Sequence, residues 1–388
     1  RIILLFGMLM LFATSLQVGK LFDTTPLKVP YEVVEYFGGV FQLFIILLTI
    51  MFAGELVWRS RDFRMDNILD ALPVPNWVFY TSKLVGLMFM QTILLTIIMV
   101  CGIIVQLFKG YTHFEIFLYI RYLYGFKLFD LWTLAVLAMF VQTIVRNKFV
   151  GYFIVALFYF WNTFFAQLVL KHNLLILSSD PGLQYSDMNG FGHAVFSYFV
   201  FKFYWGAFAL VLAVLSGLLW ARGTARSLKL RFAEARQKAH RSSWLVLTAS
   251  VLVFIGCGGF IYYNTNVENK FLTDFQQEEL QASYEKKFGS LREAPQPRVT
   301  DVALNIDLYP YIRKVHTTGT YVLKNKSAKA IDSVQILLPP SNTINALQFS
   351  RQSSLMLNDS QYACRIYKLA QPLQPGDTML MSFNINLN

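Results

Sequence analysis

The residues of this chain whose types and spacing favour chemistry lie mainly in one segment, 55–77. Glu55 opens it, and a series of arginines and aspartates follows. Pro73 ends the helical pattern, because proline blocks helix continuation. The apolar residues between these points fall on one helical face: Met65, Ile68, Leu69 and Leu72. The pattern predicts a short amphipathic helix over 63–72. Such a helix either docks in a groove of a partner protein or lies on a membrane surface, anchored by snorkelling arginines.

Polar residues inside long apolar runs are the next candidates, because burying them costs a few kcal/mol unless they pair or line a water path. Lys127 and Asp130 are three residues apart, so we expect them to pair, and we expect Arg121 to snorkel outward. The amide residues of these runs either line a translocation path or hold helices together: Gln91, Gln142, Asn162 and Gln167.

Sequence motifs for catalysis are absent. The chain has no G-x-x-x-x-G-K-[ST] phosphate loop, no G-x-S-x-G elbow and no H-E-x-x-H zinc motif among its five histidines. Its three cysteines are too few and too scattered for a disulfide scaffold or a thiolate metal site. We therefore expect no enzyme activity, metal or cofactor in this chain itself.

The composition is that of an integral membrane protein. Of the 388 residues, 55% are hydrophobic and only 15% are charged, against roughly a quarter charged in soluble domains. Runs of about 18 or more apolar residues cross a bilayer. The sequence contains seven such runs: 2–19, 38–58, 78–108, 117–145, 149–170, 203–220 and 244–263.

The distribution of basic residues predicts the orientation of these spans. With Arg1 in the cytoplasm, the inner side carries 13 lysines and arginines, whereas the outer loops 20–37, 109–116 and 171–202 carry five. Basic residues are retained in the cytoplasm, so we expect everything after 263 to be outside. More than half of the net charge of +11 lies in 221–243, which indicates a cytoplasmic loop rather than a nucleic-acid partner.

The composition changes after residue 263. Polar residues at helical spacing over 269–291, with one aromatic face, predict either a short juxtamembrane helix or a solvated spacer. Ala294-Pro-Gln-Pro297 predicts a stiff hinge. Beyond it apolar residues alternate with polar ones, for example Val302, Leu304, Ile306 and Leu308. Similar short runs recur at 320–323, 333–338, 364–369 and 379–387. Turn signals such as Asn325-Lys-Ser327 and Gln374-Pro-Gly-Asp377 separate them, which predicts an antiparallel β-sandwich.

The segment from Glu55 through Leu69-Asp-Ala-Leu-Pro-Val-Pro75 resembles the coupling region of ABC-2 type transporter permeases. The resemblance covers about 1–220, without the cytoplasmic amphipathic helix expected before the first span. It implies a helix at 59–72 that a separate ATP-binding ABC ATPase pushes, in a homodimer or with a second permease half. It assigns coupling to Glu55, Arg59, Arg61, Phe63, Arg64, Asp66, Leu69, Leu72 and Pro73, with Arg59 and Arg61 facing the ATPase or lipid phosphates.

The exterior domain resembles the N-terminal β-domain of the aminopeptidase N-like (gluzincin) family. The resemblance rests on Pro297-Arg-Val-Thr-Asp-Val-Ala-Leu-Asn-Ile-Asp-Leu-Tyr-Pro310, Gly319-Thr-Tyr-Val-Leu-Lys-Asn325 and Leu373-Gln-Pro-Gly-Asp377. Permease and exterior domain together are similar to a Bacteroidetes-like bacterial fusion protein. The family's G-x-M-E-N and H-E-x-x-H motifs are absent, so we expect this chain to be a fragment.

These observations predict an all-α polytopic membrane bundle, with six permease spans and a seventh span, followed by an extracytoplasmic antiparallel β-sandwich. The expected location is the bacterial inner membrane, in contact with its lipids. The expected function is an exporter-like ABC permease subunit. The alternatives are a membrane-anchored zinc aminopeptidase-like protein and a mechanotransmitting envelope protein. The expected divisions are 1–220 (permease), 221–243 (basic loop), 244–263 (seventh span), 264–297 (helix and hinge) and 298–388 (β-domain).

Overall fold

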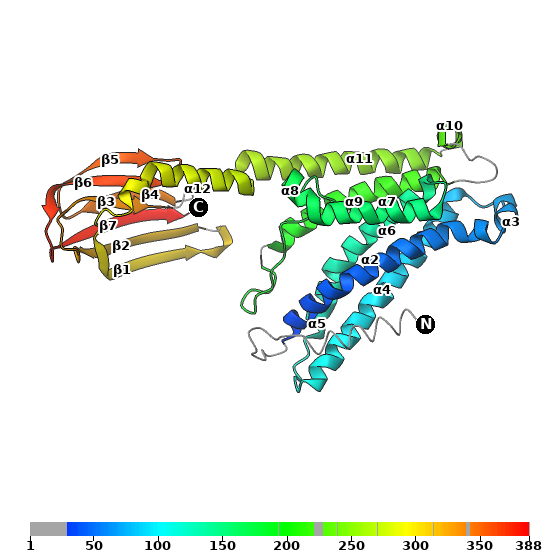
Figure 1. The fold of residues 1–388 in the computed structure, drawn as a ribbon, viewed down its shortest axis with the longest axis horizontal. Coiled ribbons are helices and arrows are strands. Elements are labelled where there is room, and N and C mark those ends of the chain that lie inside the picture. Colours follow the sequence, from blue (N-terminus) through cyan, green and yellow to red (C-terminus); the bar gives the residue numbers. More distant parts are fainter. Residues whose placement is uncertain are drawn as a thin grey trace. The chain divides into compact units, whose positions relative to one another are not determined.

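The computed structural model describes residues 29–192, 194–220, 228–238, 240–269, 271–312, 314–338 and 342–387. It divides into two compact units, Arg1–Thr273 and Asp274–Asn388. The first is helical and the second contains two β-sheets (Figure 1).

The helices of the first unit follow the predicted spans, except that two of them begin eight and nine residues earlier, at Pro30 and Ala194. Within the described residues, six segments are long and apolar enough to cross a membrane, which confirms six of the seven predicted spans. The run 2–19 lies outside the described residues. The elements are α2 (Pro30–Asp62), α3 (Asp66–Ala71), α4 (Asn76–Phe108), α5 (Ile116–Ile120), η1 (Arg121–Lys127), α6 (Leu128–Ile144), α7 (Lys148–Phe160), η2 (Trp161–Phe165), α8 (Ala166–Leu170), α9 (Ala194–Leu218), α10 (Leu228–Lys238), α11 (Arg241–Tyr262) and η3 (Tyr263–Glu268).

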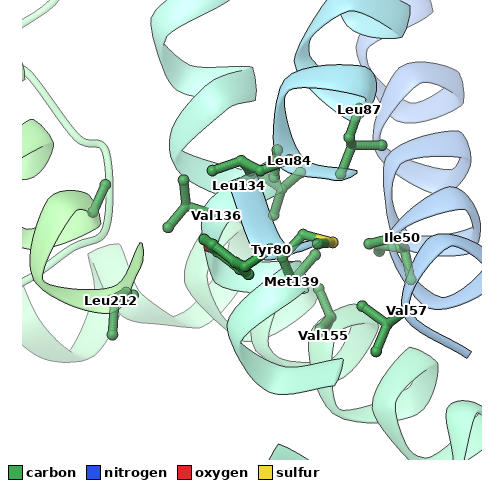
Figure 2. Packing of buried hydrophobic residues seen from close by; sticks show 14 of the residues in the cluster. Ile50, Val57, Tyr80, Leu84, Leu87, Leu134, Val136, Met139, Val155 and Leu212 are labelled. Carbon is green, nitrogen blue, oxygen red and sulfur yellow. The ribbon is translucent and has the colours of Figure 1, made fainter. Parts of the chain in front are cut away.

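Helix α6 is central, since it packs against α2, α4, α7 and α9. Its Ala135 and Ala138 are fully buried, and such small side chains let transmembrane helices approach closely. Figure 2 shows part of the surrounding apolar cluster, which includes Tyr80 and Leu84 of α4 and Met139 of α6. Within the described residues, the helical unit contains four such clusters of buried apolar residues.

Helix α9 begins earlier than the sequence predicts. The apolar run was expected to start at 203, which left Lys202 in an exterior loop, but α9 begins at Ala194. Lys202 therefore lies inside the helix, with a side chain that is only 1% exposed. That part of the prediction was wrong. The buried face of α9 begins before Lys202, at Tyr198 and Phe201, and includes the lysine itself.

The second unit is an antiparallel β-domain, as predicted. One sheet has the strand order β1-β2-β7-β4 and the other β3-β6-β5. The strands are β1 (Arg298–Tyr309), β2 (Lys314–Lys324), β3 (Ile331–Leu337), β4 (Asn342–Phe349), β5 (Ser353–Asp359), β6 (Cys364–Leu373) and β7 (Thr378–Leu387). Apolar residues of both sheets form one core, which includes Leu323, Val334, Leu373 and Phe383.

Two strands, β4 and β5, were not predicted. Each pairs with an irregular register, between Ile344 and Ala346 in β4 and between Leu355 and Leu357 in β5. An extra residue at such a point shifts the following side chains to the opposite face. The alternation of apolar and polar residues that identifies a strand is therefore broken in both.

The predicted turn at Asn325 is built by its side chain. The buried Asn325 side-chain amide donates to the carbonyls of Lys329 and Leu373, both at 2.8 Å, and its Oδ1 accepts from the Ser327 amide at 2.9 Å. Gly376, with φ of +87°, donates its N–H to the Asn325 carbonyl at 2.8 Å. The two sequence turn signals thus meet in one hydrogen-bonded corner.

Helix α12 (Asp274–Phe288) packs on the β-domain rather than standing as an isolated juxtamembrane helix. Phe288 is 7% exposed and contacts Tyr362, and the Tyr362 hydroxyl donates to Ser283 Oγ at 2.9 Å. Lys287 forms an ion pair with Asp359. The aromatic face of the predicted helix therefore stabilises the second unit itself.

The Lys287–Asp359 pair predicts a pH-dependent attachment of α12. The Lys287 hydrogen bond lowers the pKa of Asp359, so the carboxylate stabilises the folded unit at all pH values above its unfolded pKa of about 3.9. That contribution is lost as pH falls through the lower folded pKa. We expect Asp359→Asn to increase amide hydrogen exchange in α12 at pH 6, with the difference from wild type vanishing near pH 2. An undiminished difference at pH 2 would contradict the assignment.

Candidate functional site

The predicted amphipathic segment forms a helical hairpin, which we call the α2–α3 hairpin (residues 59–72). Helix α2 ends in a turn in which Met65 N–H donates to the Ser60 carbonyl at 2.8 Å and Arg64 N–H to the Arg61 carbonyl at 3.0 Å. Arg64 takes a φ of +54°, the left-handed conformation that usually requires glycine at this position. The chain therefore reverses sharply after Asp62.

The single helix expected over 63–72 is not present. Residues 63–65 form the turn, and only α3, six residues from Asp66, is helical. Leu72 is already extended, with ψ of 142°, as expected shortly before Pro73. The predicted helix is therefore replaced by three parts: a turn, the short helix α3, and an extended residue before Pro73.

Four apolar side chains of the hairpin are exposed, and we call them the apolar tip: Phe63 (69%), Met65 (52%), Ile68 (68%) and Leu72 (43%). Leu69 is half-buried. Asp66 is also half-buried. The exposed face is therefore formed by neighbours of Leu69 rather than by Leu69 itself.

The base of the hairpin is held to α7 by charge. Lys148, the first residue of α7, places its Nζ 2.7 Å from Asp62 Oδ2 and 3.3 Å from Glu55 Oε1. The Tyr152 hydroxyl donates to the same Glu55 oxygen at 3.3 Å. Gly54 permits this approach, because a Cβ there would lie 2.1 Å from the Tyr152 ring. Glu55 therefore takes part in bracing the base of the hairpin against α7.

A second set of bonds connects the hairpin base to α6. Trp58 Nε1 donates to Gln142 Oε1 at 3.0 Å, and Gln142 Nε2 donates to the Lys148 carbonyl at 3.3 Å. Gln142 is 1% exposed, and a Cβ at Gly151 would lie 2.4 Å from it. These are the contacts of a residue that holds three helices together, which was the alternative to a translocation path.

Basic residues surround the hairpin. The Arg59 side chain is exposed, whereas the Arg61 guanidinium lies over the Trp58 ring at 5.0 Å. Arg231 of α10 is buried and donates to the Thr143 carbonyl near the end of α6 at 2.8 Å. Figure 1 shows α3 and α10 at the same end of the helical unit. Part of the basic loop 221–243 is therefore docked on the bundle.

The remaining amides expected in a translocation path also make helix contacts. Gln91 is fully buried and donates to Thr49 Oγ1 at 3.0 Å and to the Leu131 carbonyl at 2.9 Å. Asn162 donates to the Leu177 carbonyl at 3.2 Å and accepts from the Leu177 amide at 3.0 Å. Gln167 lies in α8, and its side chain is outside the described part of the chain.

Sequence reasoning missed one charged cluster. Asp130 does not pair with Lys127. Its partner is Lys202 of α9, which also lies 2.8 Å from Asp180 and donates to the Ser178 carbonyl at 2.7 Å. The one available sequence signal was a lysine inside a long aromatic run, and it gave no indication of which carboxylate it meets.

No metal site accompanies these features: no three potential ligands from His, Cys, Asp or Glu lie together in the ranges that the structure describes. Comparisons with protein-family models, with curated proteins and with solved structures found no match to this chain. The functional argument therefore depends on the geometry of the hairpin and of the helical unit.

Proposed function

We propose that the chain is the membrane-spanning permease subunit of an exporter-like ABC transporter, driven through the α2–α3 hairpin by a separate ATPase subunit. The observation that supports this best is an exposed apolar tip on a hairpin whose base is braced by ion pairs and hydrogen bonds. Exposed apolar patches on polar surfaces are typical of interaction sites. The brace matters because a lever transmits force only when its base is fixed.

The brace connects the hairpin to the helices that any transport step would have to move. Glu55 and Asp62 both bond Lys148 of α7, and Trp58 bonds Gln142 of α6. A push on the tip therefore reaches α2, α6 and α7 together. A helix that only rests on the membrane surface would gain nothing from this coupling, so the ATPase-docking hypothesis accounts for more of the contacts.

The rest of the proposal follows from the orientation. The hairpin and the basic loop 221–243 are cytoplasmic, ATP is bound by the partner, and the β-domain is an aminopeptidase N-like domain in the periplasm of a bacterial inner-membrane protein. The permease works as a homodimer or with a second permease half. Nucleic acid is not a partner, because the basic residues are concentrated beside apolar spans.

Cysteine labelling tests the orientation on which the proposal depends. In a chain with Cys101, Cys257 and Cys364 replaced by alanine, we introduce Ile68→Cys or Met356→Cys, two positions that are 68% and 61% exposed. In cells with a permeabilised outer membrane, an impermeant maleimide should label position 356 and spare position 68.

Lysis of the inner membrane is the control, and it should make position 68 reactive. Labelling of position 68 before lysis would overturn the proposal, because a periplasmic hairpin cannot meet a cytoplasmic ATPase.

A further inference from the structure

The helical unit contains a cavity of about 230 Å³, which lies between α2, α6, α7, η2 and the loop 171–182. Its apolar wall includes Leu131, Leu134 and the rings of Phe158 and Tyr159. Polar groups form the rest, among them Gln42, Asn162 and Thr163. Cavities that hold drug-sized ligands measure about 300–1,000 Å³, so this one fits a smaller molecule.

One carboxylate lines this cavity, that of Asp130. Lys202 and the Ser178 hydroxyl both donate to its Oδ1. Oδ2 has no hydrogen-bond partner among the described residues, and the side chain is 30% exposed. A ligand in the cavity can therefore reach the second oxygen.

The charge around the cavity is negative. Lys202 is 1% exposed and shared between two carboxylates, those of Asp130 and Asp180. With both carboxylates ionised, one positive charge against two negative charges leaves a net charge of −1 in the cluster. Lys202 is not in the cavity wall, so the charge that meets a ligand is that of Asp130.

The loop side of the cavity is held in place by three helical elements. The Ser178 carbonyl accepts from Lys202 of α9, its hydroxyl donates to Asp130 of α6, and Asn162 bonds both backbone groups of Leu177. Asn162 lies in the π-helical segment η2, and π-helical turns are frequent at functional sites. The wall is therefore preorganised rather than a chance gap.

We propose that this cavity is a binding site for a small organic cation, a primary or quaternary ammonium group attached to a short apolar body. The ammonium group meets Asp130 Oδ2 and the faces of Phe158 and Tyr159, while the apolar body contacts Leu131 and Leu134. A carboxylate ligand is repelled by Asp130, and a neutral ligand leaves the charge of the cluster uncompensated. The site does not depend on ATPase coupling, so either proposal can fail without the other.

The test is calorimetric titration of the purified full chain in an uncharged maltoside detergent with butylammonium, butyrate or 1-butanol. We expect saturable binding of butylammonium and at least about tenfold weaker binding of the other two probes. Asp130→Asn should reduce butylammonium affinity by about tenfold or more. This variant keeps the Lys202–Asp180 pair at 2.8 Å, so the fold has a remaining counter-charge.

Two further variants keep the test decisive. Thr163→Phe places a ring at the cavity wall without removing any charge, and it should weaken butylammonium binding to a similar extent. Asp187→Asn removes a carboxylate from the loop outside the cavity wall, and it should leave affinity unchanged. Equal binding of the three probes, or wild-type affinity in both Asp130→Asn and Thr163→Phe, would overturn the proposal.

Discussion

Replacing Ile68 with aspartate is expected to reduce the ATPase that co-purifies with the chain by about tenfold or more. Ile68 is 68% exposed on the apolar tip and makes no core contact, so the substitution should not disturb insertion or folding. In a partner groove the new carboxylate would be buried without a counter-charge, which costs several kcal/mol, and each 1.4 kcal/mol is tenfold in affinity. The measurement is vanadate-sensitive ATP hydrolysis per mole of purified chain.

Two variants serve as controls for this experiment. Ile68→Met keeps an apolar side chain and should preserve ATPase recovery. Leu230→Asp introduces the same charge at an exposed position of α10, at the same end of the unit, and should have little effect. Undiminished recovery with Ile68→Asp would favour the membrane-surface role for the hairpin. Equal loss with Leu230→Asp would indicate a general charge effect instead.

The hairpin also shows where sequence reasoning fails locally. The apolar spacing of 63–72 is truly helical in period, and the sequence carries no glycine to mark the reversal. Arg64 takes the left-handed conformation that glycine normally adopts, so no sequence signal marks this turn. Consequently Leu69 was expected on the exposed apolar face, whereas it is half-buried. The other three residues of that predicted face, Met65, Ile68 and Leu72, are exposed.

The spans and the β-domain could be predicted because their signals are local. A run of about twenty apolar residues identifies a span without reference to the rest of the chain. The alternation of apolar and polar residues in β7 identifies a strand in the same way. Strands β4 and β5 were not predicted, because their register irregularities break that alternation. The contact between Glu55 and Lys148 was not predicted because 93 residues separate them in the sequence, so no local pattern relates the two.

The buried charge cluster is the clearest non-local case. Asp130 has Lys127 one helical turn away, and spacing alone favours that pair. The helix instead turns Lys127 toward the Tyr122 ring at 5.7 Å, while Asp130 meets a lysine 72 residues later. Only the packing of α6 against α9 brings these two charges together.

The same cluster makes the sharpest stability prediction. Lys202→Met keeps the length and volume of the side chain but removes its charge, which leaves Asp130 and Asp180 close together without a cation. Removing one partner of a buried ion pair typically costs about 3–5 kcal/mol. We expect Lys202→Met to lower the melting temperature and the monodisperse yield in detergent far more than Asp130→Asn does.

The asymmetry between these variants is the diagnostic result. Asp130→Asn leaves Lys202 with Asp180 at 2.8 Å and the Ser178 carbonyl at 2.7 Å, so no charge is stranded. Adding Asp130→Asn to Lys202→Met removes one of the two uncompensated carboxylates, and the double variant should therefore be more stable than Lys202→Met alone. Thermal unfolding of the wild type, the two single variants and the double variant in the same detergent gives the coupling energy as a double-mutant cycle. A Lys202→Met chain as stable as wild type would mean that the carboxylates do not depend on the lysine, and the cluster would not be the ion pair described.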